Sequence, residues 1–200
     1  MRDFNTALKI DPHYAEAYGN LGFAYENKGN LPEAILNYTK AIEINPNYVK
    51  AYDNRGRSLV KQNNLDQAVL DFTRAAQLDL NDADAFNNRG TILFLQGHFS
   101  QAASDYSRVL EIYPDYADAY YNRGLSYAKQ GYLTQALSDY NKDIKLHPDD
   151  APAYNSRAFI YFQLKDYVRA WSDIHKAERL GTAAAPELIS ALKKSSLTEP

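Results

Sequence analysis

Small and aromatic residues recur along this chain in a pattern that repeats about every 34 residues. The copies of the pattern begin at Ala15, Val49, Ala83, Ala117 and Ala151. Within each copy an aromatic residue is followed four positions later by a small residue, and residues four apart share one face of a helix. A second small residue, followed four positions later by a large apolar one, comes further on. The pattern predicts five units of two helices each, with small residues where the helices pack closely.

The repeated positions are occupied consistently in all five units. The first aromatic residue is Tyr18, Tyr52, Phe86, Tyr120 or Tyr154, and the small residue after it is Gly22, Gly56, Gly90, Gly124 or Ala158. The second small residue is Ala34, Ala68, Ala102, Ala136 or Ala170, and the large residue after it is Tyr38, Phe72, Tyr106, Tyr140 or Ile174.

Glycines and prolines stand where such helices must begin and end. Gly29, Gly97 and Gly131 follow the first helix of their units, where glycine readily ends a helix. Pro32 opens a second helix behind Asn30, because proline at the first helical position loses no hydrogen bond and asparagine is a good N-cap. Prolines that cannot continue a helix close four of the second helices: Pro12, Pro46, Pro114 and Pro148.

The periodicity divides the chain into repeats with different ends. Complete repeats are expected at 15–48, 49–82, 83–116, 117–150 and 151–184. Residues 1–14 match only a second helix, so they are expected to be the trailing helix of an incomplete repeat, which suggests truncation of a longer array. Residues 185–194 are expected to form a C-terminal capping helix, since solenoids need caps with a polar outer face. Residues 195–200 are expected to be a disordered tail.

The recurring aromatic, Gly, Ala, aromatic and Pro positions resemble the tetratricopeptide repeat (TPR) family, and the resemblance covers residues 15–184. It implies an all-α fold, a right-handed superhelical solenoid of antiparallel helix hairpins. Two local departures stand out. Asp143 occupies a position that is alanine or valine in the other repeats, and Ala158 replaces the packing glycine.

Composition narrows the possible functions. The formal net charge of −3 disfavours nucleic acid or anionic lipid as partners. The absence of cysteine excludes thiolate metal sites. No stretch approaches the length of a membrane span, so a cytoplasmic location is expected. The four histidines never show the i, i+4 spacing of helical metal ligands, and neither a nucleophile elbow nor a phosphate-binding loop is present. We therefore expect neither a metal, a cofactor nor an enzymatic activity.

Arginine and aspartate vary together between the repeats. Four of the five first helices carry an arginine directly before the small packing residue, and each of these arginines is followed sixteen residues later by an aspartate. The repeat that has Leu21 at the arginine position has Asn37 at the aspartate position. Charges that are exchanged together indicate that they neutralise each other rather than a ligand. We therefore predict structural ion pairs within hairpins: Arg55 with Asp71, Arg89 with Asp105, Arg123 with Asp139, and Arg157 with Asp173.

The resemblance also predicts a binding surface, because first helices line the concave groove of TPR proteins and asparagines at one of their positions contact the backbone of an extended peptide. The matching residues are Asn20, Asn54, Asn88 and Asn122. A carboxamide can donate and accept hydrogen bonds with any main chain. The alternative is that each asparagine merely forms a hydrogen bond with a neighbouring helix.

The same face changes character along the chain. Its N-terminal half is polar and includes Arg57, whereas the C-terminal half is apolar and carries Phe94, Tyr121, Leu125, Phe159 and Phe162. An exposed apolar run of this kind usually marks a binding surface. The lysine and asparagine spacing of the family's clamp for chaperone C-termini is absent.

These patterns predict a non-catalytic scaffold or adaptor that binds a protein or an extended peptide in the concave groove. Two alternatives stay open. The chain could be a self-assembly module that forms a homo-oligomer through its N-terminal edge, or the targeting arm of a larger enzyme. A fold that hosts many functions does not name the partner.

Overall fold

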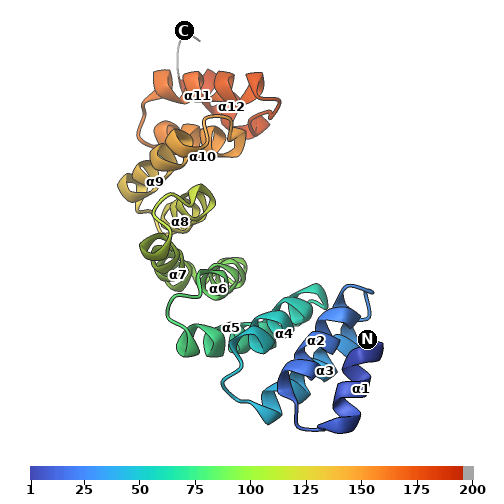
Figure 1. Ribbon diagram of the computed structural model, residues 1–200. Helices are drawn as coiled ribbons and strands as arrows, with labels where there is room; N and C mark the ends of the chain where they lie inside the picture. Colours follow the sequence, from blue (N-terminus) through green and yellow to red (C-terminus); the bar gives the residue numbers. More distant parts are fainter. Residues whose placement is uncertain (196–200) are drawn as a thin grey trace. The chain divides into compact units, whose positions relative to one another are not determined.

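The computed structural model describes residues 1–195, and in that range it contains twelve α-helices and no strand (Figure 1). The helices are α1 (Arg2–Ile10), α2 (Ala15–Glu26), α3 (Leu31–Ile44), α4 (Val49–Lys61), α5 (Leu65–Leu78), α6 (Ala83–Leu95), α7 (Phe99–Ile112), α8 (Ala117–Lys129), α9 (Leu133–Leu146), α10 (Ala151–Gln163), α11 (Tyr167–Arg179) and α12 (Pro186–Ser195). The fold is all-α, as the sequence predicts.

The chain divides into two compact units, and each is described by itself. The N-terminal unit comprises residues 1–93 and the C-terminal unit begins at Phe94. Consecutive helices pack as hairpins in both units: α2 with α3 and α4 with α5 in the first, and α8 with α9 and α10 with α11 in the second.

Glycine allows the two helices of a hairpin to approach closely. A Cβ atom on Gly22 would lie 2.8 Å from the ring of Tyr38, and one on Gly124 would lie 2.7 Å from the ring of Tyr140. Real side chains do not approach so closely, so the aromatic ring of the second helix fills the space that glycine leaves on the first. This pairing of glycine with a ring lies at the core of these two hairpins and recurs for Gly56 and Phe72, whereas the fifth hairpin pairs Ala158 with Ile174.

The turn inside each hairpin needs a residue with positive φ. Gly29, Gly97 and Gly131 adopt φ of 75°, 84° and 80°, where glycine carries little steric penalty. In the other two hairpins the matching residues are Asn63, with φ of 60°, and Lys165, with φ of 61°. The glycine pattern in the sequence did not predict these two turn positions, because neither residue is a glycine and a lysine does not indicate a positive φ.

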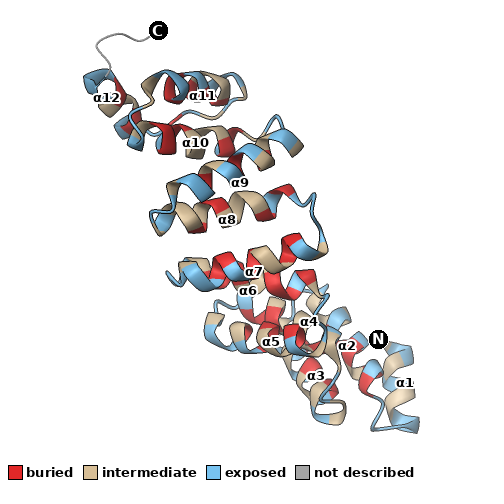
Figure 2. Ribbon diagram, turned by 90° about the vertical axis from the view of Figure 1, so that its left-hand side faces the viewer, coloured by how far each residue is buried: buried red, intermediate tan, exposed pale blue. Residues whose placement is uncertain are grey.

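The ends of the chain differ in burial. None of the residues of α1 is buried, and Ile10 is 82% exposed. At the other end Leu188 and Leu192 of α12 are buried against Trp171 and Ile174 of α11. Buried positions, red in Figure 2, recur along α10 and α11. The helix extends one residue past the expected end, so Ser195 is helical and not part of a disordered tail; residues 196–200 lie outside the described residues.

Arginine on a first helix joins two successive hairpins. Arg55 donates to Asp71 of its own hairpin, with an Nη2–Oδ1 distance of 2.7 Å, and to Thr39 of the preceding hairpin through Nη1 at 3.0 Å. The same two contacts recur for Arg123, which reaches Asp139 and Ser107, and for Arg157, which reaches Asp173 and Asn141. Arg89 likewise donates to Thr73, at 3.2 Å. These side chains therefore stabilise the packing of repeats as well as of hairpins.

Candidate functional site

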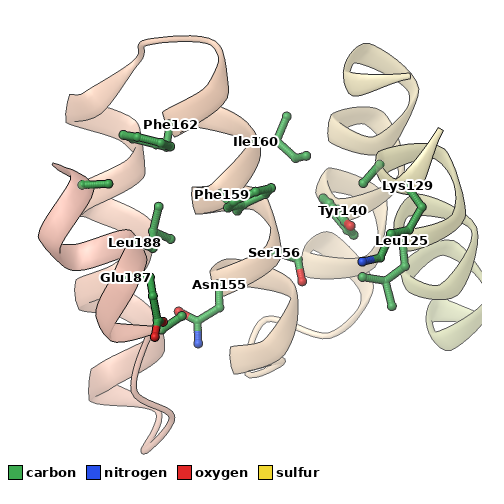
Figure 3. A pocket seen from close by; sticks show the side chains of 13 residues that line it. Leu125, Lys129, Tyr140, Asn155, Ser156, Phe159, Ile160, Phe162, Glu187 and Leu188 are labelled. Carbon is green, nitrogen blue, oxygen red and sulfur yellow. The ribbon is translucent and has the colours of Figure 1, made fainter. Parts of the chain in front are cut away.

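A cavity of about 490 Å³ lies in the C-terminal unit, and its walls come from α8, α9, α10, α12 and the segment before α12. Its lining is mostly apolar and comprises Leu125, Ala128, Lys129, Tyr140, Asn155, Ser156, Phe159, Ile160, Phe162, Ala185, Glu187, Leu188 and Ala191. Phe159 lies at the centre, with Leu188 on one side and Leu125 on the other (Figure 3). This volume is typical of cavities that bind small molecules or a few peptide side chains.

Three of the apolar residues expected to line a groove meet in this cavity: Leu125, Phe159 and Phe162. Phe159 is 46% exposed, although hydrophobic side chains of this size are usually buried. Tyr121 lies beside the cavity, where its ring packs 5.9 Å from that of Tyr140. Phe94 is not among the lining residues, and its ring packs edge-on against Phe99, with 5.3 Å between the centroids.

Some polar groups at the cavity form hydrogen bonds, and two charged residues stand at its rim. The Asn155 side-chain amide donates to the Ala183 carbonyl at 3.3 Å, and the Tyr121 and Ser156 hydroxyls lie 3.4 Å apart. Burial is the largest cause that raises the pKa of Tyr121 and of Tyr140, so both phenols stay neutral at physiological pH. Lys129 and Glu187 are exposed, and they place one positive and one negative charge on opposite sides of the apolar lining (Figure 3).

Sequence reasoning missed the wall that α12 contributes. Its residues were expected only to cover the last hairpin, and Leu188 does so, yet Glu187 and Ala191 also line the cavity. The helix begins at Pro186, close to the position where the first helix of a further repeat would start. The repeat spacing counted past residue 184 could have indicated that the cap lies beside α10.

The predicted asparagines occupy varied surroundings. Asn20 is exposed on α2, and Asn88 and Asn122 are half-buried on α6 and α8. Asn54 accepts a hydrogen bond from the guanidinium of Arg57 on the same helix. These two predicted site residues therefore bond each other within α4, a local contact that neither the peptide-binding prediction nor a bond to a neighbouring helix describes.

The polar face of the N-terminal unit is an interconnected network. Lys61 on α4 forms an ion pair with Glu26 on α2 at 2.7 Å, and the Tyr38 hydroxyl donates to the other oxygen of Glu26 at 2.9 Å. Burial, and then the neighbouring Asp82, raise the pKa of Asp53 to about 8, although Arg57 acts in the opposite direction. The charges of Lys61 and Glu26 therefore already neutralise each other within the fold, and Asp53 is largely protonated at neutral pH.

Two further findings concern residues 1–195. No group of three histidine or acidic side chains is arranged to hold a metal ion in this part of the chain. Over the same residues, none of the helices has the length and hydropathy needed to cross a bilayer.

Comparison with known families identifies the class of protein. Models described as Tetratricopeptide repeat match residues 15–48, 37–69 and 117–150, and a model described as TPR repeat matches 56–97 and 90–131. Together these models span more than half of the chain. The hairpins described above recur with the same spacing of about 34 residues that the family's repeat has. This chain belongs to the tetratricopeptide repeat family.

Solved structures of TPR proteins share the fold. YrrB, described as a TPR protein with an unusual peptide-binding site, is 23% identical with a TM-score of 0.84 over 96% of both chains. MamA is 26% identical with a TM-score of 0.78, over 80% of this chain and 94% of that one. PilF of Pseudomonas aeruginosa is 22% identical with a TM-score of 0.72, over 90% of this chain and 83% of that one. No curated protein matches the sequence at a significant level.

Proposed function

We propose that this chain is a non-catalytic interaction module that binds a protein partner through an apolar segment inserted into the C-terminal cavity. The TPR fold is generally a scaffold for protein–protein interaction, and function on such a scaffold depends on the site. The observation that supports the proposal is the apolar lining around the half-exposed ring of Phe159. Covering that ring removes apolar surface from water, which favours association.

The parts of the site would have different roles. Phe159, Phe162 and Leu125 reward apolar side chains of matching shape, whereas the Asn122 amide on α8 can hold a peptide backbone of any sequence. The name given to YrrB also supports a peptide as the ligand, although a likeness of 23% identity shows only the fold. In the N-terminal unit, Asn20, Asn54, Asn88 and Arg57 remain predicted contacts of a longer ligand.

The charges at the rim suggest how a partner is oriented. Lys129 on α8 favours an acidic residue on one side of the apolar anchor, and Glu187 on α12 favours a basic residue on the other. Exposed charges of this kind affect the rate and specificity of association more than its strength. With a net charge of −3 for the whole chain, we propose a protein partner in the cytoplasm, with no role for nucleic acid or membrane.

Selection of peptides tests this function. A library of random short peptides is selected on the intact chain, and the affinity of the retained peptides is measured by calorimetry for the F159A and F162A variants. We expect these variants to weaken binding about tenfold or more, because buried aromatic anchors carry much of the binding energy. Y113A is the matched control, since Tyr113 is 57% exposed in the same unit but does not line the cavity.

Peptide binding that does not depend on the cavity residues would overturn the proposal. If the selected peptides bind F159A and F162A as well as the unchanged chain, but lose affinity for the K142A and K176A variants, another face binds the partner. Lys142 and Lys176 lie over the rings of Tyr120 and Tyr154 and do not line the cavity.

Self-association is a second candidate function, and the exposure of α1 favours it. Tyr38 and Ala41 of α3 are 0% exposed, whereas none of the α1 residues, including the matching Phe4 and Ala7, is buried. Sedimentation of the 200-residue chain over a series of concentrations tests this function. A rising mass that the F4E variant abolishes would support it, and a constant monomer mass would exclude it.

A further inference from the structure

Asp143 occupies a position on α9 that is apolar in the matching second helices. The corresponding residues are Ala41, Ala75, Val109 and Ala177, and all of them are fully buried. Asp143 is also 0% exposed, and neither of its carboxylate oxygens accepts a hydrogen bond from a donor group. An ionised carboxylate in such a place is strongly disfavoured, so this group needs a proton or a donor.

The groups that face Asp143 are themselves acids. They are Asp150 at the start of α10, and Asp118 and Tyr121 on α8. The Asp150 carboxyl lies within hydrogen-bonding reach of Asp143, and its Oδ1 also accepts from the backbone N–H of Ala153 at 3.4 Å as the N-cap of α10. Neighbours of this kind make a negative charge on Asp143 still less favourable.

Protonation resolves the conflict. A protonated Asp143 carries an O–H that can donate to Asp150, while Asp150 continues to cap α10. Burial, followed by the charge of Asp150, raises the pKa of Asp143 to about 7, against about 3.9 for an unperturbed aspartate. The folded chain therefore holds this proton below neutral pH and releases it as the pH rises through about 7.

We propose that Asp143 and Asp150 form a proton-dependent clamp between α9 and α10, closed in mild acid and released in mild alkali. Release leaves two carboxylates side by side at the start of α10, and their repulsion loosens that helix. The same helix carries Ser156, Phe159 and Phe162 of the cavity. Binding in the cavity should therefore weaken as the pH rises, a consequence that rests on the proposed function.

Site-specific NMR tests the clamp without any ligand. The side-chain ¹³C resonance of Asp143 is followed against pH, and amide exchange in α10 is compared between the unchanged chain and D143A and D143N. Alanine occupies the matching position in three other hairpins, so D143A should fold even if D143N does not. D149N is the control, since Asp149 is exposed in the same loop.

The clamp predicts a particular pattern in these data. Asp143 should titrate near pH 7, and α10 amides of the unchanged chain should exchange faster relative to D143A as the pH rises from about 5 to about 8.5. Comparing rates at equal pH removes the intrinsic pH dependence of exchange. Titration of Asp143 near pH 4, or a rate ratio that does not change with pH, would overturn the clamp.

The effect on the cavity is measured separately, with indole as a neutral probe that does not titrate in this pH range. Indole binding is measured from the shift changes of α10 amides. The unchanged chain should bind indole severalfold more weakly in mild alkali than in mild acid, because only an ordered α10 completes the site. D143A should bind indole with the same affinity at both pH values. If indole binds at no pH, the proposed cavity function loses support, while titration and exchange still decide the clamp. If indole binds with the same affinity at every pH, the link between clamp and cavity is wrong.

Discussion

The guanidinium of Arg123 donates two parallel hydrogen bonds to the carboxylate of Asp139, each 2.8 Å long. Asp139 is nearly buried, with 6% of its side chain exposed. Removing the arginine alone should therefore strand a carboxylate, and we expect R123A to lose about 3 kcal/mol of unfolding free energy. The double variant R123L/D139L should lose less, because it leaves no charge without a partner. Urea denaturation midpoints measure both.

An exposed ion pair in the same unit provides the control. Asp115 is 82% exposed and lies 3.4 Å from Lys142, so D115A should change stability by no more than about 1 kcal/mol. If R123A is as mild as D115A, the Arg123–Asp139 pair contributes little to the hairpin.

The pairing of a small residue with a ring predicts a coupled pair of substitutions. G124A should destabilise the chain by about 1 to 3 kcal/mol, because its Cβ would lie 2.7 Å from the Tyr140 ring. The fifth hairpin has Ala158 with Ile174 at these positions, both 0% exposed. We therefore expect the loss in G124A/Y140I to be smaller than the sum of the two single losses. Strict additivity in thermal denaturation would contradict this account of the close approach.

The backbone of Lys165 predicts a stabilising substitution. Its φ of 61° is strained for any residue with a Cβ, so K165G should stabilise the chain by about 0.5 to 1 kcal/mol. The converse change G131A should destabilise it by a similar amount, since φ there is 80° and no atom lies within 4 Å of an added Cβ. Denaturation midpoints that move in the opposite direction for either variant would show that the turn relaxes.

Asp53 predicts a pH dependence in the N-terminal unit. Its pKa is raised to about 8 in the folded chain, mainly by burial and then by Asp82, against about 3.9 when unfolded. The folded state therefore binds the proton more tightly, and its contribution to stability, complete below about pH 4, is lost as the pH rises through about 8. D53N cannot ionise, so its urea midpoint relative to that of the unchanged chain should rise between pH 4 and pH 9. A constant difference between the two midpoints would show that Asp53 titrates normally.

The regular part of the fold could be predicted because each of its features has a residue type that few others can replace. The close approach of two helices requires a glycine on one helix and a ring on the other, and the sequence shows both at Gly22 with Tyr38 and at Gly124 with Tyr140. The contact of Arg123 with Ser107 could not be predicted in this way, since threonine, serine and asparagine all serve as the acceptor in different repeats. A contact that several residue types can make does not produce a conserved residue type at the same position of each repeat.

The candidate site was predictable only in part for the same reason. Phe159 and Phe162 stand out as large apolar residues on a face expected to be exposed, and both line the cavity. Glu187 and Ala191 do not stand out, because their role depends on where α12 packs beyond the last repeat. The sequence marked Asp143 as unusual, but its contact with Asp150 depends on how α10 begins against α9.

Mapping a selected peptide onto the chain by NMR tests the central claim most directly. A peptide retained from the random library is added to the ¹⁵N-labelled chain, and amide shift changes are assigned along the sequence. We predict that the largest changes fall on α8, α10 and α12 around Leu125, Phe159 and Leu188, and that they disappear in F159A but persist in Y113A. Changes centred instead on α9 and α11 around Lys142 and Lys176, and retained in F159A, would contradict binding in the cavity.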